Sequence, residues 1–243
     1  MDGVDEVLAQ RAADDASAVA YAAALSVAAA LLACLDRLDE GRPDGVRFWG
    51  LFTRAEELRC LGMLRALDHG TVPDGTPLIA LDCTRPVNDV RLGAGVVLRV
   101  GDSRYTYDPA LTHAVSRVAA TGAAPWQRRL SESGWCEAAV VQAAGRHPAT
   151  SLTLPILNYH NQVADDGGGP GLTAEAVHRD DYLALVELLG RVAVELRPES
   201  DEGWLGPLRA EADRRFDGSG IFPGDISTDE GLETGDVTAS PAT

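Results

Sequence analysis

The regular alternation of strand-like and helix-like segments constrains the fold of this chain most. Short apolar runs, which predict strands, are separated by longer alanine-rich or amphipathic segments, which predict helices. The predicted strands cover residues 46–52, 77–82, 95–100, 105–107 and 151–156, and the predicted helices cover 15–38, 55–67, 109–121, 137–144 and 173–196. Strands that are separated by helices are typical of α/β proteins. We therefore expect a mixed, mostly parallel sheet with helices on both faces.

The length and composition predict one substantial domain followed by a polar tail. With 243 residues, 45% of them hydrophobic, the chain can bury a sizeable core. We expect that domain to cover residues 1–200, with a terminal helix or linker over 201–216. Residues 217–243 consist mainly of Gly, Asp, Ser, Thr, Pro and Glu, which predicts a disordered acidic tail.

The charge of the chain excludes two classes of partner. A formal net charge of -16 argues against binding to a nucleic acid backbone or to an acidic membrane surface. The uncharged segment 16–35 has the length of a membrane span, but about half of it is alanine and acidic residues flank it. A buried core helix is the better interpretation. The acidic start of the chain predicts no secretory signal.

The four cysteines indicate a reducing compartment. They lie at positions 34, 60, 83 and 136, mostly in apolar surroundings, and they form no C-x-x-C pair. We interpret them as reduced, buried side chains of a cytoplasmic protein.

Two adjacent glutamates, Glu56 and Glu57, follow the predicted strand 46–52 and lie in the first turn of the predicted helix 55–67. Neighbours on a helix diverge by about 100°, so two adjacent carboxylates can do different work. One can hold a metal ion while the other takes a proton from water bound to that ion. The alternative is structural, because acidic residues are favoured in the first turn of any helix.

Three further positions carry candidate metal ligands. Asp14 precedes the first predicted helix, Asp82 ends the strand 77–82, and His160 follows the strand 151–156. Taken singly, each has a structural explanation: a helix cap, a turn residue or an exposed loop histidine. Together with the glutamates they form a set of carboxylates and one imidazole, which suits a hydrolytic zinc, cobalt or manganese centre.

Five segments, taken in order, resemble the co-catalytic dinuclear zinc aminopeptidases of the glutamyl-aminopeptidase and tetrahedral-aminopeptidase family. The segment 52–57 with Gly62 is similar to that family's "F-T-x-x-E-E-x-G-x-x-G". The other similar segments are 12–15, 78–84, 92–97 and 154–160. The resemblance covers residues 11–196 and implies a partial zinc-exopeptidase-like catalytic domain from which the first strands are missing.

The resemblance also implies roles for the candidate residues. Glu56 would be the general base, Glu57 and His160 would hold one metal ion, Asp82 would hold the other, and Asp14 would bridge them. The ligands would bind one or two divalent ions, zinc or else cobalt or manganese. The implied activity is release of amino-terminal residues from a peptide substrate. The resemblance is also compatible with a homo-oligomer.

The chain also departs from the family pattern. The family has a metal-binding histidine upstream of the glutamates, whereas the first histidine here is His69. Glu137 replaces an aspartate, and Asn158 replaces an arginine. Three interpretations follow. The chain is a hydrolase with a divergent site, the carboxyl-terminal part of such an enzyme, or a non-catalytic descendant that binds or scaffolds.

Overall fold

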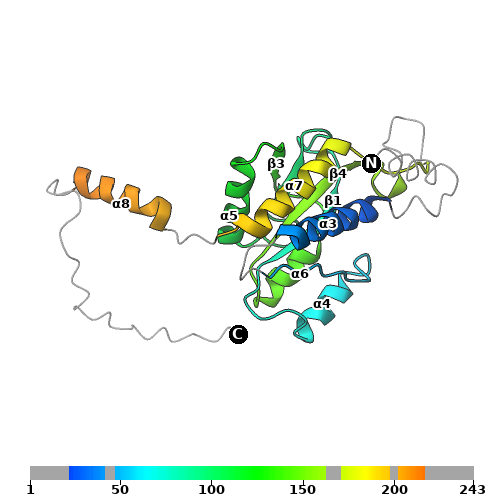
Figure 1. Cartoon of the computed structure of the whole chain (residues 1–243), viewed down its shortest axis with the longest axis horizontal. Coiled ribbons are helices and arrows are strands. Elements are labelled where there is room, and N and C mark those ends of the chain that lie inside the picture. Colours follow the sequence, from blue (N-terminus) through cyan, green and yellow to red (C-terminus); the bar gives the residue numbers. More distant parts are fainter. Residues whose placement is uncertain (1–21, 42–46, 163–170, 198–201, 217–243) are drawn as a thin grey trace, which may run out of the picture. The chain divides into compact units, whose positions relative to one another are not determined.

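The computed structural model describes residues 22–41, 47–162, 171–197 and 202–216 (Figure 1). The chain divides into two compact units, Met1–Pro198 and Glu199–Thr243. The second unit contains helix α8, Glu202–Phe216, within the segment expected as a terminal helix or linker. The predicted tail, 217–243, lies outside the described residues.

A five-stranded sheet forms the centre of the first unit. Its path is β1-β4-β2-β3, with β5 paired to β4. The parallel ladders, β1 with β4 and β2 with β3, are longer than the antiparallel ladders of β4 with β2 and β5, which confirms the expected mixed, mostly parallel sheet. The strands are β1 Leu78–Thr84, β2 Val96–Arg99, β3 Trp126–Arg129, β4 Ala149–Leu157 and β5 Ala176–Val177.

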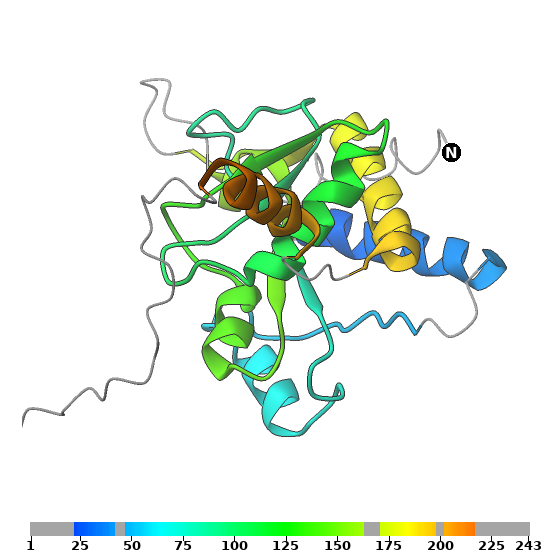
Figure 2. The same cartoon turned by 90° about the vertical axis from the view of Figure 1, so that its left-hand side faces the viewer.

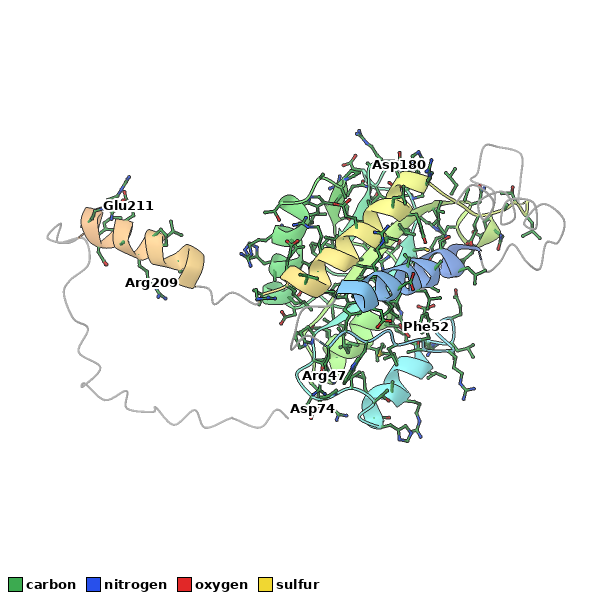
Figure 3. All side chains as sticks on the ribbon, in the orientation of Figure 1. Arg47, Phe52, Asp74, Asp180, Arg209 and Glu211 are labelled. Carbon is green, nitrogen blue, oxygen red and sulfur yellow. The ribbon has the colours of Figure 1, made fainter. Side chains whose placement is uncertain are left out.

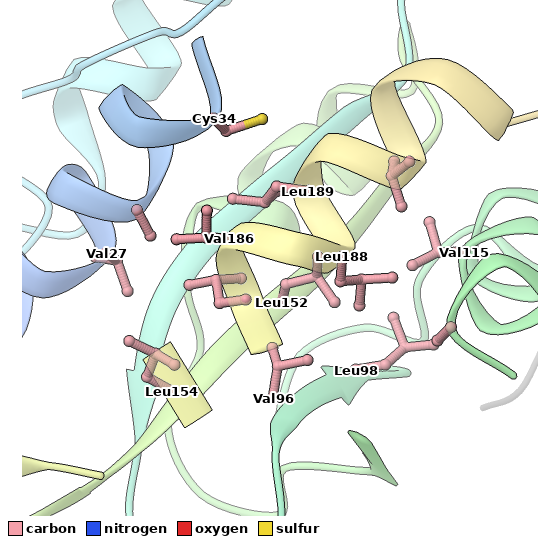
Figure 4. Packing of buried hydrophobic residues seen from close by; sticks show 14 of the residues in the cluster. Val27, Cys34, Val96, Leu98, Val115, Leu152, Leu154, Val186, Leu188 and Leu189 are labelled. Atoms are coloured by element: carbon pink, nitrogen blue, oxygen red, sulfur yellow. The ribbon is translucent and has the colours of Figure 1, made fainter. Parts of the chain in front are cut away.

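Three helices cover one face of the sheet: α3 Ala22–Gly41, α5 Pro109–Ala120 and α7 Arg179–Glu195. Figure 4 shows their apolar side chains packed against alternate residues of the strands. Leu98 and Leu152, both fully buried, point to this face. This cluster is the larger of two hydrophobic cores, and its burial supplies most of the apolar stabilisation of the fold.

Two shorter helices, α4 Leu61–Asp68 and α6 Glu137–Ala144, cover the opposite face (Figures 1 and 2). Their core includes Met63, Val141 and Ala149, with Ala80 packed beside them. Because side chains alternate along a strand, Asp82 lies on the same face as Ala80. The apolar core on this face therefore lies next to the Asp82 carboxylate, near the carboxyl end of β1.

The glutamate pair lies in different local structure from that predicted. Residues 47–52 form no strand, because a strand needs a ladder partner and no described strand pairs with them. Helix α4 begins at Leu61 rather than at residue 55, so Glu56 and Glu57 lie in the preceding turn. The predicted strand and the predicted start of the helix were therefore wrong. The strand prediction failed because a local sequence pattern does not show whether a partner strand is present.

Other boundaries also shift. Residues 105–107 contribute only an isolated bridge between Gly101 and Thr106. The short strand β5 precedes α7, which begins at Arg179 rather than at residue 173. Strand β3 has no counterpart in the prediction, because its sequence WQRR is polar and lacks a strand-like apolar run.

Helix α3 carries most of the segment that has the length of a membrane span. Val27, Ala30 and Cys34 are buried against the sheet, whereas Leu25 and Leu32 are exposed. Among the residues that the structure describes, no helix is long and apolar enough to cross a membrane. All four cysteines are free and buried, as expected for small apolar side chains.

Candidate functional site

The turn that carries the glutamate pair has an unusual backbone. Ala55, Arg59 and Cys60 have φ values of 61°, 69° and 55°, in the left-handed region that side chains other than glycine rarely adopt. The turn folds back closely on Gly62, where an added Cβ would lie 2.1 Å from the carbonyl oxygen of Arg54. Gly62 therefore permits the close approach that fixes the position of the glutamates.

Glu57 and His160 meet although they come from distant parts of the sequence. The distance from His160 Nε2 to Glu57 Oε1 is 3.6 Å, and the two side chains are 48% and 77% exposed. Two ligands of one tetrahedral zinc ion, each about 2.0–2.1 Å from it, lie roughly 3.3 Å apart. The spacing of this pair therefore suits two ligands of one ion.

Neighbouring groups hold His160 in place. It lies in a short turn, Tyr159–Asn161, directly after β4, and its φ of 57° is left-handed. Its backbone N–H donates to Glu175 Oε1 at 2.8 Å. Its ring stacks on Tyr159, with ring centroids 4.2 Å apart and planes inclined by 15°. Burial raises the pKa of Tyr159 to about 12.

Glu56 is better shielded from water than Glu57. Burial, and then the negative charges of Asp82 and Glu57, raise the pKa of Glu56 to about 7. The Cys60 thiol donates to Glu56 Oε1 at 3.6 Å, which partly offsets that rise. A carboxyl group with a pKa near neutrality can both accept and return a proton, as a general base must.

Asp82 is held by an ion pair. Its Oδ2 accepts a hydrogen bond of 3.0 Å from Arg99 Nη1, and its Oδ1 accepts one of 2.7 Å from the backbone N–H of Cys83. The Asp82 side chain is 29% exposed and that of Arg99 only 6%. Both carboxylate oxygens of Asp82 therefore already have donors within the protein.

Glu137 also belongs to this region. It opens α6 and accepts a hydrogen bond from the Thr53 hydroxyl. Burial, and secondarily Asp82, raise the pKa of Glu137. Sequence reasoning identified Glu137 only as a departure from the family pattern. Its position, aligned with a family aspartate next to the site, was the available signal.

The candidate ligands do not form a complete metal site in the described part of the chain. Within that part, no group of three or more His, Cys, Asp or Glu side chains is placed to hold an ion. Glu57 and His160 approach each other and suit one ion, whereas Asp82 faces Arg99. The predicted bridging ligand, Asp14, lies outside the described residues.

The fold defines an α/β protein with carboxylates near the end of a sheet strand, and sequence comparison specifies the family. The model of the M42 glutamyl aminopeptidase family matches residues 18–188. This match covers more than half of the chain, so the chain belongs to that family. No curated protein sequence matches it.

Solved structures of related proteins have the same fold. PhTET1-12s, a dodecamer in the asymmetric unit, is 24% identical, with a TM-score of 0.55 over 70% of this chain and 48% of that one. A TET aminopeptidase from a marine sediment archaeon of the Thaumarchaeota is 19% identical, with a TM-score of 0.57 over 72% and 48%. An aminopeptidase from Desulfurococcus kamchatkensis is 16% identical, with a TM-score of 0.53 over 70% and 47%. The chain thus spans about half the length of the solved structures that it matches.

Proposed function

We propose that this chain provides part of the catalytic domain of a metal-dependent aminopeptidase, which removes amino-terminal residues from peptides. The observation that carries the proposal is the approach of Glu57 to His160, with Glu56 beside them. Two ligand types that zinc accepts meet next to a carboxyl group whose pKa suits proton transfer. Membership of the M42 family supports the same chemistry.

In this proposal each residue has a defined role. Glu57 and His160 would hold a divalent ion, zinc or else cobalt or manganese, with Asp14 as a further ligand. When bound, such an ion would supply Lewis-acid chemistry, which lowers the pKa of a water molecule and polarises the scissile carbonyl. Glu56 takes a proton from the attacking water and returns it to the leaving amine. Tyr159, stacked on His160, keeps the imidazole oriented.

Hydrolysis of aminoacyl-anilides by the full chain, with zinc, cobalt or manganese added, tests this proposal. Glu56→Gln removes the base and keeps the side-chain size, so we expect the rate to fall roughly 10²- to 10⁴-fold. Glu187→Gln, at an exposed position on α7, is the matched control and should keep the full rate. A rate in Glu56→Gln equal to that of the control would overturn the proposal.

A second candidate function is binding without catalysis. The observation that favours it is the Asp82–Arg99 ion pair, which engages one of the expected ligands. In that case the chain would bind peptides without cleaving them, and no added metal would produce turnover. Peptide binding by calorimetry, together with no measurable hydrolysis under any of the three metals, would support this alternative.

Two further features of the proposed enzyme are its location and its assembly. We place it in the cytoplasm, because its four cysteines are free and buried in the structure. We also propose a homo-oligomer, since a related solved structure is a dodecamer. Light scattering from the purified chain would show the assembly, and a monomer at micromolar concentration would contradict it.

A further inference from the structure

Arg99 reaches across the sheet to the carboxyl end of β1. It lies on β2 and is separated from β1 by β4, yet its Nη1 donates to Asp82 Oδ2 and its Nη2 donates to the Cys83 carbonyl at 3.3 Å. The residue is only 5% exposed. A planar guanidinium that is bonded to two acceptors has little freedom to move away.

The charge surroundings keep this cation in place. Although burial by itself lowers the pKa of Arg99, the charge of Asp82 is the main opposing effect, and the net shift is upward. Glu56 and Glu137 are close enough for Asp82 to raise the pKa of each. Asp82, Glu56 and Glu137 thus form a cluster of carboxylates that needs a positive charge nearby. Arg99 supplies that charge in place of a metal ion.

We propose that the Arg99 guanidinium takes the place of one cation of the expected two-metal site, so that this chain binds a single divalent ion, at Glu57 and His160. The inference rests on the proposed function for the site of that one ion. A second ion at Asp82 would have to sit beside a buried guanidinium, where water screens the repulsion between like charges only weakly. Asp82 then acts as the partner of Arg99 rather than as a metal ligand.

Arg99 is a positioning residue in this arrangement. It touches neither the expected ion nor the peptide, and it acts through Asp82. By holding Asp82, it also fixes the end of β1 next to the turn that carries Glu56. Because positive charge, rather than shape alone, is what Arg99 supplies, a lysine at this position should preserve the single-ion state.

Metal stoichiometry of the full chain tests the inference directly. The protein is stripped with a chelator, dialysed against zinc and analysed for zinc per chain, with calorimetry for affinity. We expect one ion in the wild type and in Arg99→Lys, and two ions in Arg99→Met, in which Asp82 becomes free. Arg104→Met removes the same charge from an exposed position and should still bind one ion.

Asp82→Asn provides a second test that does not depend on the folding of Arg99→Met. We expect this variant to retain one ion and to bind it with an affinity within roughly tenfold of that of the wild type. Roughly tenfold is the lower end of the loss in affinity that follows when a residue supporting a metal ligand is removed. Two ions in the wild type, or loss of an ion in Asp82→Asn, would overturn the inference and leave the proposed function standing. No zinc bound by the wild type, or zinc binding that is unchanged in His160→Ala, would overturn the proposed function itself.

Discussion

Individual residues at the site work through neighbours that lie far away in the sequence. Glu57 acquires its partner from the turn after β4, and Asp82 acquires its partner from β2. Glu56 is surrounded by negative charge and is partly buried, which makes its ionisation costly. Because its pKa is raised in the folded state, Glu56 makes the free energy of unfolding depend on pH.

The pH dependence of stability should change when Glu56 is replaced by glutamine. The folded-state pKa of Glu56, about 7, lies above its ordinary value of 4.5, so the folded protein binds the proton more tightly than the unfolded chain does. The stabilising effect is fully present below about pH 4.5 and is lost as the pH rises to about 7. Thermal unfolding in this range should show a smaller loss of stability in Glu56→Gln than in the wild type. Parallel curves for the two proteins would contradict the prediction.

At the scale of the elements, a single buried side chain can fix a loop to a helix. Asp181, in the first turn of α7, is fully buried and accepts hydrogen bonds from the backbone N–H groups of Gly93 and Gly95 at 2.8 and 2.6 Å. Gly95 has a φ of 93°, and a Cβ there would lie 1.8 Å from the Pro125 carbonyl oxygen. The loop before β2 is thus fixed to α7.

Replacing Asp181 by alanine should therefore destabilise the fold strongly. Two backbone N–H groups would lose a charged acceptor, at a cost of about 2–4 kcal/mol in the free energy of unfolding. Its neighbour Asp180, whose side chain is 66% exposed and which Figure 3 labels at the start of α7, provides the control. Asp180→Ala should cost less than about 1 kcal/mol, because it loses only exposed interactions, one with the helix dipole and one with His178. Equal losses for both variants in urea unfolding would argue against this account.

At the scale of the whole molecule, excess negative charge opposes compaction. The net charge is -16 at pH 7, so self-repulsion among surface carboxylates destabilises the folded state. The Asp82–Arg99 pair lies within the fold, where added salt screens it little.

Added salt should therefore stabilise the chain at pH 7. Raising sodium chloride from about 0.01 M to about 0.15 M shortens the screening length from about 30 to about 8 Å. We expect Tm to rise by roughly 2–4 °C, which corresponds to about 1 kcal/mol for a chain of this size. Differential scanning fluorimetry of the metal-free protein measures the shift, and a fall in Tm would show that surface ion pairs outweigh self-repulsion.

Sequence patterns predicted the parts of this protein that depend on local chemistry. Helix α6 lies at its predicted bounds, and α5 begins at its predicted first residue, Pro109, where the Asp108 carboxylate accepts from Leu111 N–H at 2.7 Å. These features depend on residues within one helical turn, which the sequence displays directly. The alternation of the segments predicted the mixed sheet, and the resemblance of five segments to known motifs predicted the family that the family model matches.

Only the tertiary structure decided which side chains face each other. It brings Glu57 to His160, draws Glu137 into the same region and pairs Asp82 with Arg99. The sequence placed Asp82 at a strand end but could not show that a guanidinium from β2 would reach it, because β4, the strand between them, comes later in the chain. Local order thus determined most of the elements, the family resemblance and the candidate ligands. The pairing of strands decided the partners of those ligands, since contacts across a sheet depend on topology.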